Sequence, residues 1–180
     1  MEEQENVISL DIKLIAIKTL QLSICVAVAV AAPYFLNQLV TGSIVNALLF
    51  ISASIFGLET AFLLCLVPSL ISLYTGLLPL AIAPMIPFII TGNALMVLIF
   101  SKATRLRQGY GEARNFWAGA IPAALVKYVF IYSVGTLLAS SVLKGTAKGV
   151  LLMISWPQLA TAIAGASIAY LFLKTIHPVK

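Results

Sequence analysis

The sequence predicts an all-α protein, an integral membrane bundle of six transmembrane helices that forms a single domain over residues 1–180. Hydrophobic residues make up 61% of the chain and charged residues only 9%, whereas a typical soluble domain has about 25% charged residues. The mean hydropathy is +1.07. A soluble domain of this size cannot bury so much apolar surface, so we expect most side chains to face lipid or one another.

Six apolar segments are each suited to form one helix across a bilayer, which requires roughly 20 apolar residues. The second and third segments divide a stretch that is too long for one helix, and we place the break at Gly57 to Glu59. Runs such as Leu48 to Ile51 do not alternate between apolar and polar residues, which excludes lipid-facing strands. The expected helices cover residues 12–35, 43–56, 59–75, 81–101, 116–143 and 149–174.

Lysine and arginine residues gather at one set of helix ends. With the N-terminus placed inside, the inner flanks hold eight of these cations and the outer flanks hold only Lys144 and Lys148. Because cytoplasmic loops are enriched in Lys and Arg, we expect both termini in the cytoplasm and a multi-pass protein of the cell membrane. The inner cations are Lys13, Lys18, Lys102, Arg105, Arg107, Arg114, Lys174 and Lys180.

The sequence gives no support for catalysis, metal binding or nucleic-acid binding. It has no Walker A loop, no His-Glu-x-x-His and no Gly-x-Ser-x-Gly, and its one histidine, His177, cannot form a metal cluster. Cys25 and Cys65 lie in apolar runs, where we expect them to pack as small hydrophobic side chains. We therefore expect a protein that is not an enzyme, holds no cofactor or metal, and uses its net charge of +5 for membrane orientation.

Lys127 is the cation that lies deepest within a predicted span. It lies roughly 17 Å from the inner face at 1.5 Å per residue, near the midplane of the bilayer. An ammonium group at that depth requires an anionic ligand, a carboxylate, or a set of carbonyls and amides. We favour a role in a cavity, with Tyr128 beside it, although hydrogen bonds between helices would also satisfy the lysine.

Two amides are expected at a similar depth. Asn93 lies midway along the fourth predicted span, and Gln158 lies about ten residues into the sixth. Pro157 is expected to kink the sixth helix. Trp156, Pro157 and Gln158 together are expected to form a pocket wall. The alternative for each amide is a hydrogen bond that joins two helices.

Further polar residues follow the first span. Asn37, Gln38 and Thr41 are assigned to the first outer loop, with Asn46 one turn into the second helix. Asn37 and Asn46 are expected either to close over a ligand or to be solvated. Glu59 opens the third span at the inner face, where an acidic residue favours a helix N-terminus.

The first span carries small residues at intervals of four, at Ser23, Ala27 and Ala31. This spacing places them on one stripe, which another helix can approach closely. We expect the stripe to contact another helix, with packing inside the bundle as one reading.

Five short strings are spread along the chain: TGSIVNA at 41–47, VPSL at 67–70, APMIPF at 83–88, GNA at 92–94 and WPQL at 156–159. In these strings the sequence resembles the S component, the membrane-embedded substrate-binding subunit of energy-coupling factor (ECF) transporters. The size, the six spans and the inside termini agree with that family over most of the chain. The stripe of Ser23, Ala27 and Ala31 is then, by the resemblance, the partner-docking face.

The resemblance implies a subunit that binds a vitamin or related micronutrient from outside, in a pocket in the outer half of helices four to six. It also implies a coupling membrane subunit and two ATPase subunits as partners, which hydrolyse ATP for uptake, and docking through small residues of the first helix. Lys127 favours an anionic cargo over a cationic one. The alternative function is a membrane scaffold or assembly subunit that carries no vitamin.

Overall fold

The computed structural model describes residues 2–35, 37–78, 80–106, 112–141, 152 and 154–176, and these residues form helices without any strand. Five of the described helices are long and apolar enough to cross a membrane, and α3 is a shorter apolar helix. The elements are α1 (Glu2–Phe35), α2 (Gln38–Ile55), α3 (Leu58–Tyr74), the 3₁₀ helix η1 (Leu80–Met85), α4 (Ile86–Leu106), α5 (Glu112–Ser141) and α7 (Trp156–Ile176).

The all-helical class and the break at Gly57 are confirmed, but several predicted helix boundaries are wrong. Helix α2 begins at Gln38 rather than at residue 43, because Asn37 is its N-cap and accepts a hydrogen bond from the Val40 amide at 3.0 Å. Gln38 and Thr41 therefore belong to the helix and not to a loop. Helix α1 begins ten residues before the apolar segment that was predicted to span the membrane.

The predicted fourth span also begins too early, and the sixth has its long helix only in its later part. The fourth opens as the 3₁₀ helix η1 and becomes the α-helix α4 only at Ile86. Helix α7 begins at Trp156, seven residues after the predicted start. Proline is compatible with the first turn of a helix, where its missing amide proton has no acceptor, and Pro87 and Pro157 both occupy second positions. The predicted limits at residues 143 and 149 lie outside the described residues.

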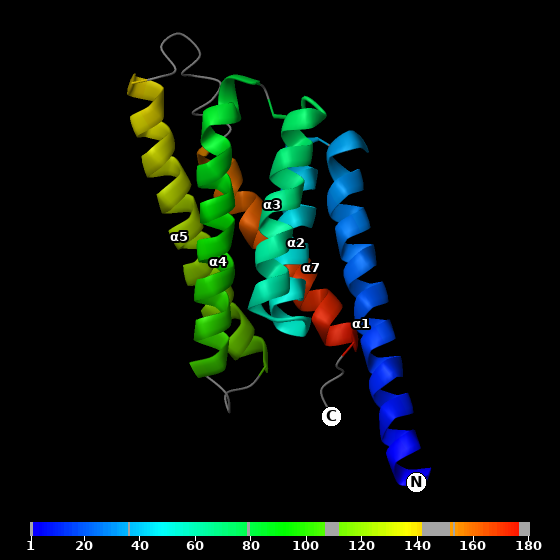
Figure 1. Cartoon of the computed structure of the whole chain (residues 1–180). Coiled ribbons are helices and arrows are strands. Elements are labelled where there is room, and N and C mark those ends of the chain that lie inside the picture. The colour runs from blue at the N-terminus through cyan, green and yellow to red at the C-terminus, as the bar shows by residue number, and fades with distance from the viewer. Residues whose placement is uncertain are drawn as a thin grey trace.

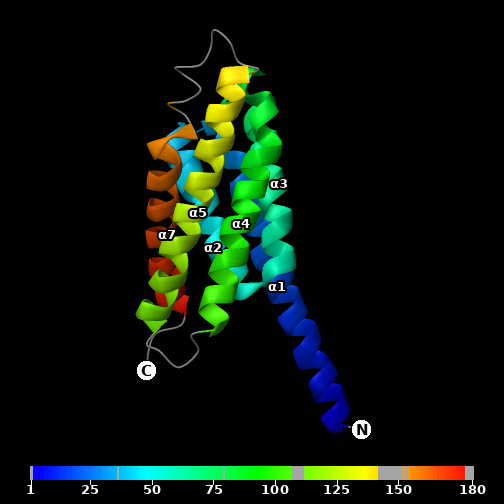
Figure 2. The same cartoon turned by 90° about the vertical axis from the view of Figure 1, so that its left-hand side faces the viewer.

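Helix α2 lies at the centre of the bundle and packs against α1, α3, α4 and α7. Helix α5 packs against α4 and α7. Helix α1 begins and α7 ends at the same end of the bundle, which we call the lower end, and the first turns of α1 extend beyond it (Figures 1 and 2). Helices α2, α4 and α7 begin at the opposite, upper end.

Two apolar clusters lie on either side of the bundle's middle. In the lower half, the rings of Phe50 and Phe116 pack on Phe100, with centroid distances of 4.9 Å and 5.2 Å. Toward the upper end, Ile82 and Met85 of η1 pack with Ile131 of α5 and with Ile154. The buried polar residues Asn93 of α4 and Lys127 of α5 lie between the two clusters along their helices.

Helices α2 and α7 pack at very short range because Gly165 has no side chain. A Cβ atom at Gly165 would lie 2.6 Å from the Cβ of Asn46 and 2.7 Å from the carbonyl oxygen of Ser43. Both distances are shorter than van der Waals contact, and one of the atoms belongs to the backbone. The glycine therefore sets the distance at which α7 meets Asn46.

We expect Gly165→Ala to lower the stability of the fold by about 1–3 kcal/mol, the usual cost of overpacking a close contact. The measurement is the thermal unfolding midpoint of the purified protein in detergent. Ala164→Ser, which adds one heavy atom at the exposed neighbouring position, is the control and should leave the midpoint unchanged. Equal midpoints for the two variants would show that α2 and α7 are not in this close contact.

Candidate functional site

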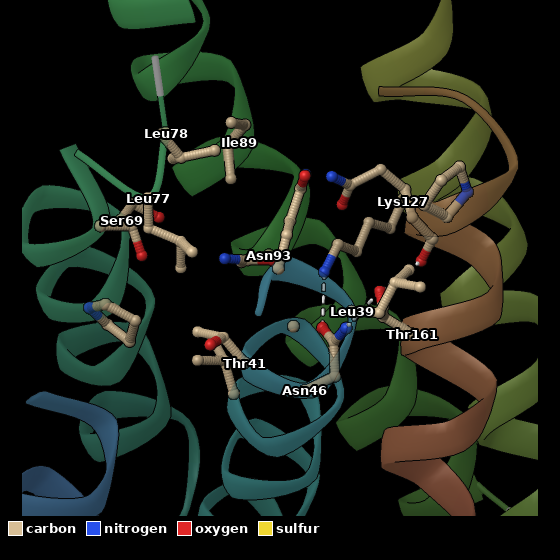
Figure 3. Close-up of a pocket in the computed structure, with 17 residues that line it drawn as sticks. Leu39, Thr41, Asn46, Ser69, Leu77, Leu78, Ile89, Asn93, Lys127 and Thr161 are labelled. Atoms are coloured by element: carbon tan, nitrogen blue, oxygen red, sulfur yellow. Dashed lines mark hydrogen bonds between the residues drawn. The ribbon is translucent and has the colours of Figure 1, made fainter. Parts of the chain in front are cut away.

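A cavity of about 80 Å³ lies in the upper half of the bundle, among α2, α3, α4, α5 and α7. We call it the Lys127 cavity (Figure 3). Its volume is several times the roughly 10–15 Å³ that admits one water molecule. Its polar lining residues are Gln38, Thr41, Asn46, Ser69, Ser72, Asn93, Lys127, Gln158 and Thr161.

Lys127 is held by a chain of hydrogen bonds through three helices. Its ammonium group donates to Oδ1 of Asn46 at 2.5 Å, and Nδ2 of Asn46 donates to Oγ1 of Thr161 at 3.3 Å. Oγ1 of Thr161 donates in turn to the carbonyl oxygen of Gln158 at 3.2 Å. The chain fixes the orientation of the Asn46 amide, because the donor to Thr161 leaves only the oxygen to face the lysine (Figure 3).

The charge of Lys127 has no carboxylate near it in the cavity. The side chain is only 3% exposed, and none of the described residues that line the cavity is acidic. A buried ammonium group loses the hydration it has in water, and one neutral amide replaces only part of it. The cavity therefore carries a net positive charge and favours an anion over a cation.

Asn93 brings an unpaired polar atom to the cavity. Its side chain is 3% exposed, and its Oδ1 atom makes no hydrogen bond with the described residues. Figure 3 shows Asn93 projecting between Lys127 on one side and Ser69 and Leu77 on the other. An unpaired amide oxygen in an apolar interior costs about 1–3 kcal/mol, which a bound molecule with an N–H or O–H group would offset.

The structure brings together four of the seven residues that the sequence nominated for binding. Asn46, Asn93, Lys127 and Gln158 line the cavity, and they come from α2, α4, α5 and α7. Asn46 lies two turns into α2 rather than one, because that helix begins earlier than predicted. This depth is what brings its amide to the level of the lysine.

The other three nominated residues lie outside the cavity lining. Tyr128 follows Lys127 on the next face of α5 and stacks on Tyr132, with ring centroids 5.8 Å apart. Trp156 is 58% exposed at the start of α7. Asn37 caps α2, and its Oδ1 atom accepts a hydrogen bond from the Val40 amide.

The predicted kink at Pro157 is wrong, although the residue does line the cavity. Pro157 is the second residue of α7, so it interrupts no hydrogen bond of the helix interior. Gln158 is the third residue of α7 and not the tenth of a longer helix. It lies in the first turn of α7, whose start is at the upper end of the bundle.

Sequence reasoning missed Thr161 and the two serines Ser69 and Ser72. Ser and Thr are common in apolar helices, where their hydroxyls bond to a carbonyl of the preceding turn, so none of them is conspicuous alone. Their spacing could have indicated a shared polar face. Thr161 follows Gln158 by three residues, and Ser72 follows Ser69 by three, which places each pair on one helix face.

The predicted docking stripe lies on an exposed face of α1. Ser23, Ala27 and Ala31 are all exposed, and they line a shallow groove with Thr19 and neighbouring residues of the same helix. The hydroxyls of Thr19 and Ser23 donate to carbonyl oxygens of their own helix, each at 2.9 Å. The stripe therefore presents small groups with satisfied hydroxyls and is not used in packing this bundle.

Comparisons of the chain with protein-family models, curated proteins and solved structures find no match.

We expect Asn46→Leu to destabilise the protein by about 2–3 kcal/mol, because it leaves the Lys127 ammonium buried without its acceptor. The double variant Asn46→Leu with Lys127→Met should recover most of this loss, since it removes the charge as well as its partner. Equilibrium unfolding in detergent measures all three proteins. A double variant no more stable than Asn46→Leu alone would show that the two side chains are not coupled.

Proposed function

We propose that the chain is the substrate-binding subunit of an ECF-type importer, which captures an anionic vitamin or related micronutrient from outside the cell. One observation carries the proposal. The buried Lys127 ammonium faces a cavity that contains polar groups from four other helices and no carboxylate. A protein that had no use for the charge would be expected to lack it, because an ionised group within a membrane span is costly.

The distribution of the cations supports an orientation with the lower end in the cytoplasm. Lys102 and Arg105 end α4, Arg114 lies in the first turn of α5, and Lys174 ends α7, all at the lower end. In this orientation the Lys127 cavity belongs to the outer half of the membrane, where an imported molecule first arrives. Arg107, Lys144, Lys148, His177 and Lys180 lie outside the described residues.

The exposed stripe of α1 supports the proposed partners. Small residues let a second helix approach within close packing distance, and lipid alone does not require them. We assign the stripe to the coupling membrane subunit, with two ATPase subunits bound to that subunit and supplying the energy for uptake. Their hydrolysis of ATP takes place outside this chain.

A scaffold or assembly subunit without cargo is the second candidate. The hydrogen bond from Lys127 to Asn46 favours it, because the lysine then has a partner within the protein. This function leaves the cavity and the unpaired oxygen of Asn93 without a role. The importer function accounts for all three features.

We expect at least one anionic vitamin to raise the unfolding temperature of the purified protein in a screen of a vitamin panel. A ligand at 100 times its Kd adds about 2.7 kcal/mol, which such a screen detects easily. Lys127→Ala should weaken binding of that vitamin about 30-fold, or about 2 kcal/mol, through loss of a buried charged hydrogen bond. Lys102→Ala, which removes an exposed cation at the lower end, is the control, and equal weakening by both variants would exclude Lys127 from the site.

We expect the tagged protein to co-purify with a coupling membrane subunit and two ATPases from its native membrane. Ala27→Phe should abolish the co-purification, because the ring prevents a close approach to the stripe. Val28→Phe adds a larger side chain on a different exposed face of α1 and should retain the partners. If the partners still co-purify with the Ala27→Phe variant, the docking face lies elsewhere. If no ATPase co-purifies with the wild-type protein, the scaffold function is favoured.

A further inference from the structure

We infer that the cargo of the Lys127 cavity is a monocarboxylate with an apolar body, bound with its carboxylate inward against Lys127 and its body toward the upper end. The inference rests on the proposed function and specifies its substrate class. It follows from the way polarity, charge and free volume change with depth in the cavity.

The lining of the cavity becomes more polar with depth, whereas most proteins are polar at the surface and apolar inside. Its deepest polar side chains are nearly inaccessible, with exposed fractions of 3% for Lys127, 2% for Asn46 and 6% for Thr161. The apolar residues nearer the upper end are only partly buried, and Leu39 is 45% exposed. A molecule that matches this gradient enters with its polar end first.

The apolar part of the rim is built by the turn after α3 and the start of α4. Gly76, with φ 75°, lets the chain reverse, and the Leu78 amide donates back to the carbonyl oxygen of Ser72 at 2.9 Å. This turn places Leu77 and Leu78 over the cavity, and Leu78 lies beside Ile89 (Figure 3). Gln38 and Gln158, near the starts of α2 and α7, also line the cavity, so its lining toward the upper end is apolar only in part.

The charge of the site matches a single carboxylate better than a phosphate. Lys127 is the only cation among the described residues that line the cavity. A phosphate monoester carries about −1.5 to −2 charges at neutral pH, so one ammonium would leave part of its charge buried and unpaired. A carboxylate balances the ammonium one to one, and its charged hydrogen bonds are short and strong.

The free volume separates the two parts of the cargo. About 80 Å³ is enough for a small polar head, but drug-sized pockets measure roughly 300–1,000 Å³. The head therefore fits at the level of Lys127, while the body occupies the rim between Leu39 and the Leu77–Leu78 turn. Apolar contact at the rim then adds to the affinity in proportion to the apolar area removed from water.

The test uses acetate, butyrate and hexanoate, each paired with the primary amide of the same length, on the full chain in nanodiscs. Kd values come from unfolding temperatures measured over a series of ligand concentrations. We expect Kd to fall roughly two- to fourfold for each added methylene, the factor for burying a CH₂ group partly or fully. Each carboxylate should bind at least tenfold more tightly than its amide.

Two variants assign these effects to their residues. Lys127→Met should remove the preference for carboxylate over amide, and it also reports any partition of the probes into the lipid. Leu78→Asn should reduce the gain with chain length and keep the carboxylate preference, so the inference remains testable if Lys127→Met does not fold.

The inference would be overturned if the affinity of the carboxylates does not rise with chain length, or if Lys127→Met still prefers carboxylates over amides. Either result would leave a small-anion importer intact. The absence of binding by every carboxylate would overturn it as well. Co-purification with the coupling subunit tests the proposed function separately, so the two failures are distinguishable.

Discussion

The hydrogen bond between the Lys127 ammonium and the Asn46 amide is the constraint on which the upper half of the bundle depends. An ammonium group in an apolar interior is tolerated only where neutral polar groups surround it, and here they come from helices far apart in the sequence. Asn46 accepts from the lysine and is itself oriented by Thr161. Three helices, α2, α5 and α7, are therefore positioned by one charge.

The apolar packing around this centre supports the same arrangement. The aromatic cluster of Phe50, Phe100 and Phe116 joins α2, α4 and α5 below the cavity, and the isoleucine and methionine cluster joins η1 to α5 toward the upper end. These clusters hold the helices that carry the polar residues of the cavity, and the low dielectric of the packed side chains strengthens the interactions of Lys127. The cavity of about 80 Å³ and the Asn93 Oδ1 atom, which has no hydrogen-bond partner among the residues that the structure describes, lie in this region.

Much of the architecture was predictable from the sequence because apolar composition and length restrict a membrane chain to few solutions. Lys127 and Asn93 were predictable for the same reason, since a charge or an amide stands out in an apolar run. Helix starts were not, because Pro157 fits a first turn as well as an interior kink, and only the backbone distinguishes them. The Asn37 cap carried a recognisable signal for the start of α2, but the apolar pattern alone placed it later. Thr161 was missed because the hydroxyl of a threonine in a helix usually donates to a carbonyl oxygen of its own helix.

The close contact at Gly165 has a consequence for how the molecule changes shape. At Gly165 the backbone of α7 lies so close to α2 that the two helices cannot approach further, and we expect them to move together and to carry Asn46 and Thr161 with them. The turn at Leu77 and Leu78, in contrast, is joined by the Leu78 amide to the carbonyl oxygen of Ser72, at the end of its own helix α3. If a molecule larger than the present void binds as proposed, we therefore expect the α3 side of the cavity to be displaced while the Asn46 side keeps its position.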